Sequence, residues 1–195
     1  MTEQELNERV KQNLNTETKK YSFKLTDIVE IIEAPYLTKH EEQIYLYKQI
    51  HNSKHLTPTA TNISIVYFII NSNGEICGKI PITVNESPNH ASMDYWLKPK
   101  FQGLGIGSVA IATTISHLFT TGELDNLEFN THKGRMSTSI DEIQLDINTN
   151  NIPSRKVATK LGFVEDENDP TTFLLTKENY LNKKLNCESS GEKIW

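Results

Sequence analysis

A glycine-rich turn between a predicted strand and a predicted helix is the feature that most constrains this chain. The strand is expected over 91–97 and ends before Pro99, and the apolar stretch 106–119 is expected to be helical. Between them lie glycines at positions 103, 105 and 107. Such glycines allow positive φ and let a ligand approach the backbone N–H groups at the partly positive start of a helix. The turn therefore suits a phosphate or pyrophosphate, although a tight strand–helix connection would explain the same glycines without a ligand.

Two common phosphate motifs do not fit this turn. A P-loop places lysine directly after its last glycine, and Ser108 follows Gly107 here. A dinucleotide fingerprint needs a third glycine after the first strand of a parallel unit, but Ala110 occupies that position. In addition, a strong hairpin signal comes earlier, with predicted strands over 62–70 and 75–84 joined by Asn-Ser-Asn-Gly.

The remaining elements follow from apolar spacing and from turn residues. A capping-box pair, Thr38 and Glu41, predicts a helix over Thr38–Ile50, and Pro81 predicts an edge position or a bulge in its strand. Strands are expected over 21–32, 140–147, 163–164 and 172–175, and a helix over 153–161 capped by Gly162. The predicted organisation is an N-terminal extension 1–20 with an apolar stripe of Leu6, Val10 and Leu14, a domain 21–180 that includes a long connection 120–139, and a loose polar tail 181–195.

Composition excludes several classes of protein. The chain has 195 residues, of which 36% are hydrophobic and 23% charged, so extensive disorder is excluded. No apolar run approaches the ~20 residues that a membrane helix needs. The net charge of the chain is −5, so it lacks the overall positive charge that is typical of nucleic-acid-binding domains. Cys77 and Cys187 form neither a metal spacing nor a disulfide framework. With a polar, acidic N-terminus, these features predict a cytoplasmic protein without a metal, membrane or nucleic-acid partner.

A second motif follows the strand predicted over 140–147. It comprises Asn151-x-x-Ser154 and Lys160-Leu161-Gly162-Phe163. Together with Gln102-x-x-Gly105-x-Gly107, this motif resembles the GNAT superfamily of acetyl-CoA-dependent N-acetyltransferases. The combination of Tyr95-Trp96-Leu97 with Asn-x-x-Ser is most similar to the ribosomal-protein N-terminal acetyltransferase branch. The resemblance covers about 60–176 and implies an α/β (α+β) fold, with a mixed, mostly antiparallel twisted sheet, flanking helices and a strand splay at the coenzyme.

The resemblance also implies positions for acetyl-CoA. Gln102 opens the motif, and the pyrophosphate would bind the backbone amides of Gly103, Leu104, Gly105, Ile106, Gly107 and Ser108. The pantetheine arm would hydrogen-bond the end of the third strand at Trp96 and Leu97 like an added strand. Trp96 is expected to be both a core residue and a wall of this site. Asn151 would contact the pantetheine, and Ser154 would lie near the thioester sulfur.

Direct attack of a neutral amine on the thioester requires a base for the amine and a proton for the leaving thiolate. Asp146 is the preferred base, because relatives resembling this chain carry a catalytic glutamate at that position. Asp94 is the second candidate, and either carboxylate can equally be a solvated surface charge. The tyrosine acid of the subfamily is replaced by Ala158, which leaves Ser154 as the hydroxyl for the thiolate. Ser154 can equally be a hydroxyl that satisfies backbone amides at the helix start.

The sequence therefore predicts an N-acetyltransferase that uses acetyl-CoA and a primary amine, without a covalent enzyme intermediate. A protein or peptide α-amine is the favoured acceptor and a small amine the second. The connection 120–139 and residues 1–60 are expected to shape the acceptor site, and a homodimer is compatible with the sequence. Two alternatives remain: a non-catalytic acyl-CoA-binding sensor, and a structural or partner-binding domain that binds no coenzyme.

Overall fold

The computed structural model describes residues 4–5, 8–10, 12–13, 28–34, 38, 43–51, 63–84, 87–122, 125, 128–131 and 134–190. The chain divides into two compact units. Unit 1 comprises Met1–Asn52, Ser64–Pro81 and Tyr95–Thr114, and unit 2 comprises Ser53–Ile63, Ile82–Asp94 and Ile115–Trp195.

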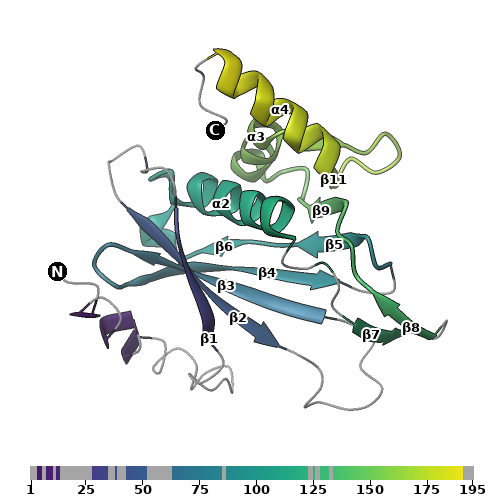
Figure 1. The fold of residues 1–195 in the computed structure, drawn as a ribbon. Helices are drawn as coiled ribbons and strands as arrows, with labels where there is room; N and C mark the ends of the chain where they lie inside the picture. Colours follow the sequence, from purple (N-terminus) through teal and green to yellow (C-terminus); the bar gives the residue numbers. More distant parts are fainter. Residues whose placement is uncertain are drawn as a thin grey trace. The chain divides into compact units, whose positions relative to one another are not determined.

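Antiparallel strands form the body of unit 1. In sheet order these are β1 (Ile28–Glu33), β2 (Ile44–His51), β3 (Ile63–Asn71) and β4 (Ile76–Val84), as Figure 1 shows. The short strand β6 (Trp96–Leu97) pairs with the first half of β4. β3 is buried along almost its whole length, and since successive side chains point to opposite faces of the sheet, both of its faces are covered. The predicted hairpin of β3 and β4 is confirmed.

The predicted helix over Thr38–Ile50 is wrong, because this region contains strand β2. β2 pairs with β3 through eight residues, from Ile44 opposite Asn71 to His51 opposite Ser64. Consecutive side chains from Leu46 to Lys48 are all buried, so the strand shows no alternation of apolar and polar residues. Without that alternation, the spacing of its apolar residues also matched a helical face.

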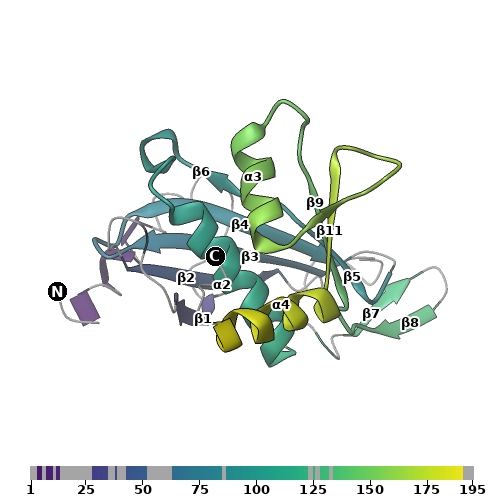
Figure 2. The same cartoon turned by 90° about the horizontal axis from the view of Figure 1, so that it is seen from above.

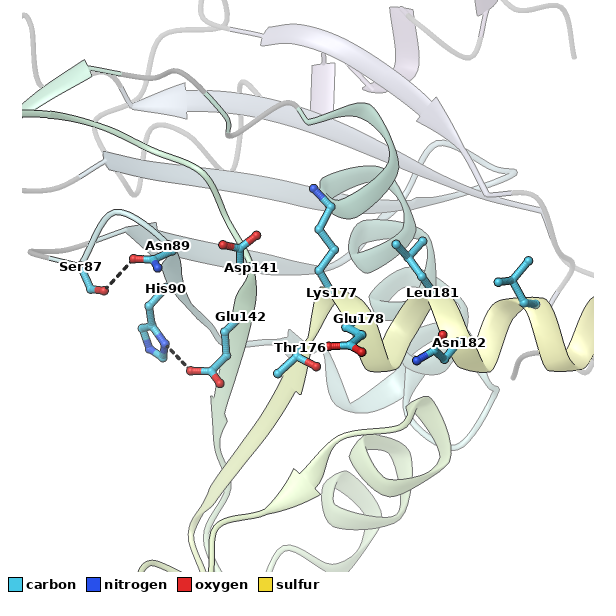
Figure 3. A pocket seen from close by; sticks show the side chains of 11 residues that line it. Ser87, Asn89, His90, Asp141, Glu142, Thr176, Lys177, Glu178, Leu181 and Asn182 are labelled. Atoms are coloured by element: carbon cyan, nitrogen blue, oxygen red, sulfur yellow. Dashed lines mark hydrogen bonds and ion pairs between the residues drawn. The ribbon is translucent and has the colours of Figure 1, made fainter.

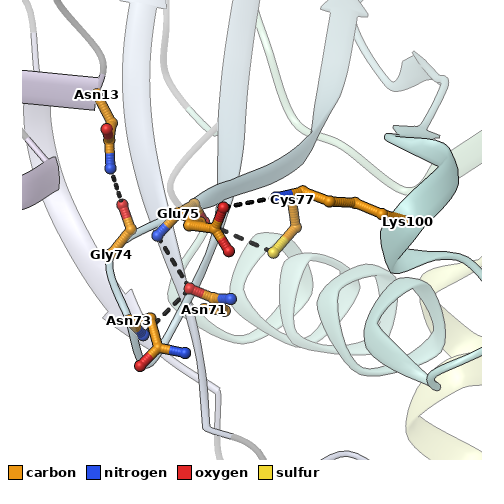
Figure 4. Close-up of polar contacts among 7 residues, drawn as sticks. All are labelled: Asn13, Asn71, Asn73, Gly74, Glu75, Cys77 and Lys100. Atoms are coloured by element: carbon orange, nitrogen blue, oxygen red, sulfur yellow. Dashed lines mark hydrogen bonds and ion pairs between the residues drawn. The ribbon is translucent and has the colours of Figure 1, made fainter.

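The N-terminal extension contacts the sheet of unit 1. Val10 is fully buried in a cluster with Tyr47, Val66, Phe68, Ile70 and Ile76. The Nδ2 of Asn13 also donates to the carbonyl oxygen of Gly74 in the β3–β4 turn, at 2.5 Å (Figure 4). Of the predicted stripe, Val10 is therefore a core residue, whereas Leu6 and Leu14 lie outside the described residues.

The strands of unit 2 form a mixed ladder. The end of β4 pairs antiparallel with β5 (His90–Met93), and β5 pairs in parallel with β9 (Glu142–Asp146). β9 continues antiparallel to β11 (Thr172–Thr176), which pairs antiparallel with β10 (Val164–Glu165). Both the mostly antiparallel character and the predicted final strand pair are confirmed. The pairing of β5 with β9 ends at Met93 and Leu145, as a splay beyond these residues requires.

The strand predicted over 91–97 is divided into β5 and β6. β4 pairs with β6 at Gly78 and Lys79, and with β5 from Ile82 to Val84. Pro81 lies between these paired stretches, where its missing N–H leaves no ladder bond to lose. The predicted edge position is therefore wrong, since β4 has a partner on each side, and the proline instead marks the change of partner.

Three helices follow the sheet strands. α2 (Ile106–Thr121) confirms the predicted helix, and it is buried almost all round. The buried hydroxyls of Thr113 and Thr114 donate to the carbonyl oxygens four residues earlier, at 2.8 and 2.9 Å. α3 (Ile152–Leu161) ends as predicted at Gly162, whose φ of 99° lies in the left-handed region.

No helix in the described part of the chain is long and apolar enough to cross a membrane.

Two predicted irregular regions contain regular structure. Within 120–139, β7 (Glu128–Thr131) and β8 (Gly134–Ser137) form a separate two-stranded antiparallel sheet (Figure 2). The predicted loose tail is wrong for 181–190, because α4 spans Lys177–Ser190. Tyr180 of α4 packs against Phe119, with ring centroids 5.5 Å apart. This contact within unit 2 holds a helix whose mostly polar sequence has no continuous apolar stripe.

Candidate functional site

The glycine turn in unit 1 has the backbone geometry of an anion site. Gly103 and Gly105 have φ values of 73° and 84°, which an L side chain rarely adopts. The N–H of Val109 donates to the carbonyl oxygen of Gly105 at 3.2 Å, which is the first i to i−4 hydrogen bond of α2. The amides of 106–108 come before this bond and therefore have no acceptor within the helix. The first turn of α2 contains no acidic residue. These amides therefore face their surroundings without a carboxylate from their own turn to neutralise them.

Side-chain contacts fix the turn from its N-terminal side. The helix η3 (Pro99–Phe101) precedes it, and Phe101 is buried. Gln102, the first residue of the motif, donates from Nε2 to the carbonyl oxygen of Leu97 at 3.1 Å. Lys100 forms an ion pair with Glu75, with Nζ 2.6 Å from Oε1 (Figure 4). Gln102 thus ties the glycine turn to β6 through its side chain.

Strand β6 presents one edge away from β4. Among the described residues, β4 is its only strand partner. The N–H of Lys98 donates to the oxygen of Cys77 at 2.8 Å, so the alternation of a β-strand directs the N–H and C=O of Leu97 to the other edge. This is the edge where the sequence predicts the pantetheine arm. The expectation that Trp96 is a core residue is wrong, because 48% of it is exposed.

Gly78 lies directly beside β6, as the register partner of Leu97, and the sequence analysis did not identify it. A Cβ at Gly78 would lie 2.0 Å from the oxygen of Trp96 and 3.0 Å from the Cα of Leu97. Only glycine therefore allows β4 and β6 to approach this closely. A lone glycine inside an apolar strand commonly marks such an approach, and Ile-Cys-Gly-Lys carries that signal.

In unit 2 the two candidate bases lie at the same end of the β5–β9 ladder. Met93 and Leu145 are its last registered pair, and Asp94 and Asp146 are the residues that follow them. Both aspartates are exposed. The parallel register thus places two aspartates that are far apart in the sequence at the same end of the ladder.

Asp146 is held by two donors through a single oxygen. Its Oδ1 accepts from Gln144 Nε2 at 2.7 Å and from Thr172 Oγ1 at 3.3 Å. Among the described residues, none donates a hydrogen bond to Oδ2. Thr172 also lies 3.2 Å from Asp169 Oδ2, and its one proton serves either carboxylate. Hydrogen bonds from the side chain and backbone of Thr171 lower the pKa of Asp169. In Asp146, the two donors orient Oδ1, and Oδ2 is left to accept a proton.

Asn151 begins helix α3. Its side-chain oxygen accepts from the N–H of Ser154 at 3.4 Å, which makes it the N-cap. The capping role considered for Ser154 thus belongs to Asn151. Among the described residues, none bonds to the Ser154 hydroxyl, which is half-buried at the first turn of α3. Ala158 is fully buried within the helix.

Replacement of the cap tests this assignment. We expect Asn151→Ala to lower the free energy of unfolding by about 0.5–2 kcal/mol, because one amide of α3 loses its acceptor. At roughly 2–4 °C per kcal/mol for a domain of this size, differential scanning calorimetry should detect the change. Asn151→Asp retains an acceptor and is the matched control. Equal melting of the alanine variant and the parent chain would contradict the capping role.

The hairpin β7–β8 lies away from the candidate bases. After β8, the N–H of Ser139 donates to the oxygen of Pro88 and that of Asp141 to Asn89, both just before β5. The hairpin therefore joins β9 at its amino end, whereas Asp146 is at its carboxyl end. Within the described ranges, no group of three or more His, Cys, Asp or Glu side chains is placed to hold a metal ion.

The solved structures to which this chain is similar include the following three acetyltransferases. Mutant forms of the spermidine/spermine N-acetyltransferase SpeG from Vibrio cholerae are 15% identical, with a TM-score of 0.49 over 68% of this chain and 73% of that one. RimJ from Mycobacterium smegmatis, in complex with CoA-disulfide, is 20% identical, with a TM-score of 0.46 over 66% and 61%. A GNAT-family acetyltransferase from Bacillus anthracis is 15% identical, with a TM-score of 0.45 over 64% and 70%.

The family follows from the sequence match. No curated protein matches this chain closely enough to count as a relative. The family described as "Acetyltransferase (GNAT) domain" matches residues 23–164, well over half of the chain. That span includes the glycine turn, Asp146 and the Asn151-x-x-Ser154 motif. The chain belongs to the GNAT family of acetyltransferases.

Proposed function

We propose that this GNAT N-acetyltransferase transfers the acetyl group of acetyl-CoA to a primary amine, and that the preferred amine is the α-amine of a protein or peptide. A small amine is the second candidate acceptor. The observation that carries the coenzyme assignment is the glycine turn, where Gly103 and Gly105 have positive φ directly before α2. The amides at that helix start are the groups that would bind the pyrophosphate.

The residues of unit 1 fit coenzyme A in two respects. A Cβ built on Gly103 would have no protein atom within 4 Å, so the turn leaves room on that side for a ligand. Leu97 directs its N–H to the edge of β6 that faces away from β4, where an extended pantetheine arm can pair with it. When bound, acetyl-CoA supplies a thioester that an amine can attack directly.

The choice of acceptor rests on the proton that the attacking amine must lose. A lysine side chain, with a pKa of about 10.4, needs about 4.6 kcal/mol to become neutral at pH 7, whereas an α-amine needs about 1 kcal/mol. We propose Asp146 as the base, with Asp94 as the second candidate. Asp146 is an exposed carboxylate with one oxygen free to accept a proton. Such a base is better suited to an α-amine, whose deprotonation needs less free energy than that of a lysine side chain.

The thiolate that leaves needs a proton, and we assign this task to Ser154. Ala158 occupies the position of the subfamily's tyrosine acid and is fully buried inside α3. That position therefore offers no proton. The Ser154 hydroxyl is half-buried, and the described part of the chain gives it no hydrogen-bond partner. It can act either as a donor or as the contact of a bridging water.

Binding of acetyl-CoA should raise the melting temperature of the chain. At a concentration 100 times Kd, binding adds about 2.7 kcal/mol to stability. For a domain of this length, that corresponds to roughly 5–10 °C in a differential scanning fluorimetry experiment. Gly103→Ala should reduce the shift, because its methyl group enters the space left for the ligand.

Thiol release with a panel of amines then identifies the acceptor. Faster release with peptides than with small amines would support the α-amine assignment, and the reverse order would favour the second candidate. A clear thermal shift without amine-stimulated release would indicate a sensor and contradict the proposed transfer. No shift at millimolar acetyl-CoA would overturn the coenzyme assignment itself.

A further inference from the structure

Unit 2 contains a groove at the end of the β5–β9 ladder opposite Asp94 and Asp146. Its volume is about 930 Å³. It is lined by three segments that lie together in Figure 3: 87–90 at the start of β5, 141–142 at the start of β9, and 176–185 at the end of β11 and along α4. No residue of the proposed coenzyme or base machinery lines it.

The groove carries an excess of negative charge. Asp141, Glu142 and Glu178 line it, and among the described residues Lys177 is the only lysine or arginine in its lining. The Nζ of Lys177 lies 3.9 Å from Asp125 Oδ2, so this charge already has an acidic partner. Glu142 accepts from His90 Nδ1 at 3.1 Å (Figure 3). Within the described part of the chain, the carboxylates of Asp141 and Glu178 have neither a hydrogen bond nor an ion pair.

The same groove exposes apolar surface. Leu181 and Leu185 lie four residues apart on α4, hence on one face of the helix. They are 38% and 63% exposed, whereas Tyr180 and Cys187 on the same helix are buried. α4 therefore packs on unit 2 through one side and presents leucines to the groove through another. The groove thus places two exposed leucines beside carboxylates that have no partner among the described residues.

We propose that this groove docks a basic segment of a polypeptide partner, with an apolar side chain of the partner against Leu181 and Leu185. Charge complementarity carries the choice of occupant, because lysine or arginine would pair with Asp141 and Glu178. A single small cation would satisfy a carboxylate but leave both leucines in water. A segment that combines basic and apolar side chains covers both kinds of surface. This docking goes beyond acetyl transfer and does not depend on it.

Fluorescence anisotropy with the full chain tests the docking. The probe is a short labelled peptide that alternates lysine and leucine. We expect binding that weakens as salt is added, because exposed charges are screened. Leu185→Ser should weaken binding about fivefold or more, because it removes apolar contact. Glu178→Gln should weaken binding by up to about fivefold, because it removes an exposed charge that has no partner in the free chain. Val164→Ser is the matched control, since Val164 is 60% exposed on β10 outside the groove, and it should bind like the parent.

Several results would overturn the proposal. A probe with serine in place of leucine that binds equally well would show that the leucines are not part of the surface. A probe with glutamate in place of lysine that binds equally well would remove the charge argument. Sedimentation velocity identifies a second copy as the occupant if the parent chain dimerises, Leu185→Ser is monomeric and the probe does not bind. The salt dependence of the parent chain decides the charge argument even if a variant fails to fold.

Discussion

Replacement of Asp146 by asparagine is expected to lower kcat by about 10²–10⁴-fold, the usual contribution of a general base. Asparagine keeps the size of the side chain and still accepts from Gln144 and Thr172 through its amide oxygen, so the end of β9 should be preserved. It cannot take a proton from the attacking amine. Binding of acetyl-CoA should change little, because its proposed phosphate contacts lie at 103–108. Steady-state thiol release and the thermal shift measure the two effects separately.

Glu167→Gln is the matched control for this variant. Glu167 is exposed in unit 2 between β10 and β11, and its replacement removes the same unit of charge. It should leave kcat within a factor of about two, since isolated surface charges contribute little. If Asp146→Asn also retains full turnover, Asp146 is not the base, and Asp94→Asn becomes the next variant to measure. A loss of coenzyme binding in Asp146→Asn would instead point to a positioning role.

The candidate coenzyme site was accessible from the sequence because its signals are local. A glycine turn, a proline at the start of α3 and Gly162 at its end each report their own backbone conformation. The order of hairpin, strand and helix then places the turn at the start of α2. Which residues face the acceptor was not accessible in this way, because it depends on contacts between distant segments.

Strand β2 shows how burial hides a strand in the sequence. Because both faces of β2 are covered, consecutive side chains from Leu46 to Lys48 are buried, and the apolar residues of 44–50 do not alternate with polar ones. A capping-box pair upstream then made a helix the better match. The cover comes from segments that are distant in the sequence, such as Val10 against Tyr47, and no window around β2 contains that information.

Helix α4 illustrates the opposite problem. Its sequence is polar, and among its described side chains Tyr180 and Cys187 are the two that are buried. Its stability comes from contacts outside the helix, such as Tyr180 with Phe119 and Lys183 with the carbonyl oxygen of Lys160. The latter places a positive charge at the carboxyl end of α3, where the helix dipole favours it. Such contacts become visible only once the fold is known.

Gly78→Ala is expected to weaken acetyl-CoA binding at least about tenfold, although Gly78 lies outside the recognised motifs. The added Cβ would lie 2.0 Å from the oxygen of Trp96 and 2.9 Å from Leu97 Cδ2. A backbone oxygen cannot rotate out of the way, so β6 must move relative to β4. That movement displaces Leu97 and, through its bond to Gln102, the glycine turn. We expect the free energy of unfolding to fall by about 1–3 kcal/mol.

Separate measurements distinguish the loss of binding from the loss of stability. Urea unfolding gives the stability of Gly78→Ala, and calorimetric titration with acetyl-CoA gives its Kd below the unfolding transition. Gly134→Ala is the control, because Gly134 has positive φ on β8 but open space around its Cβ, so only conformational strain is added. It should bind acetyl-CoA like the parent chain. If Gly78→Ala folds and also binds normally, the edge of β6 does not hold the pantetheine arm, and the coenzyme relies on the helix start alone.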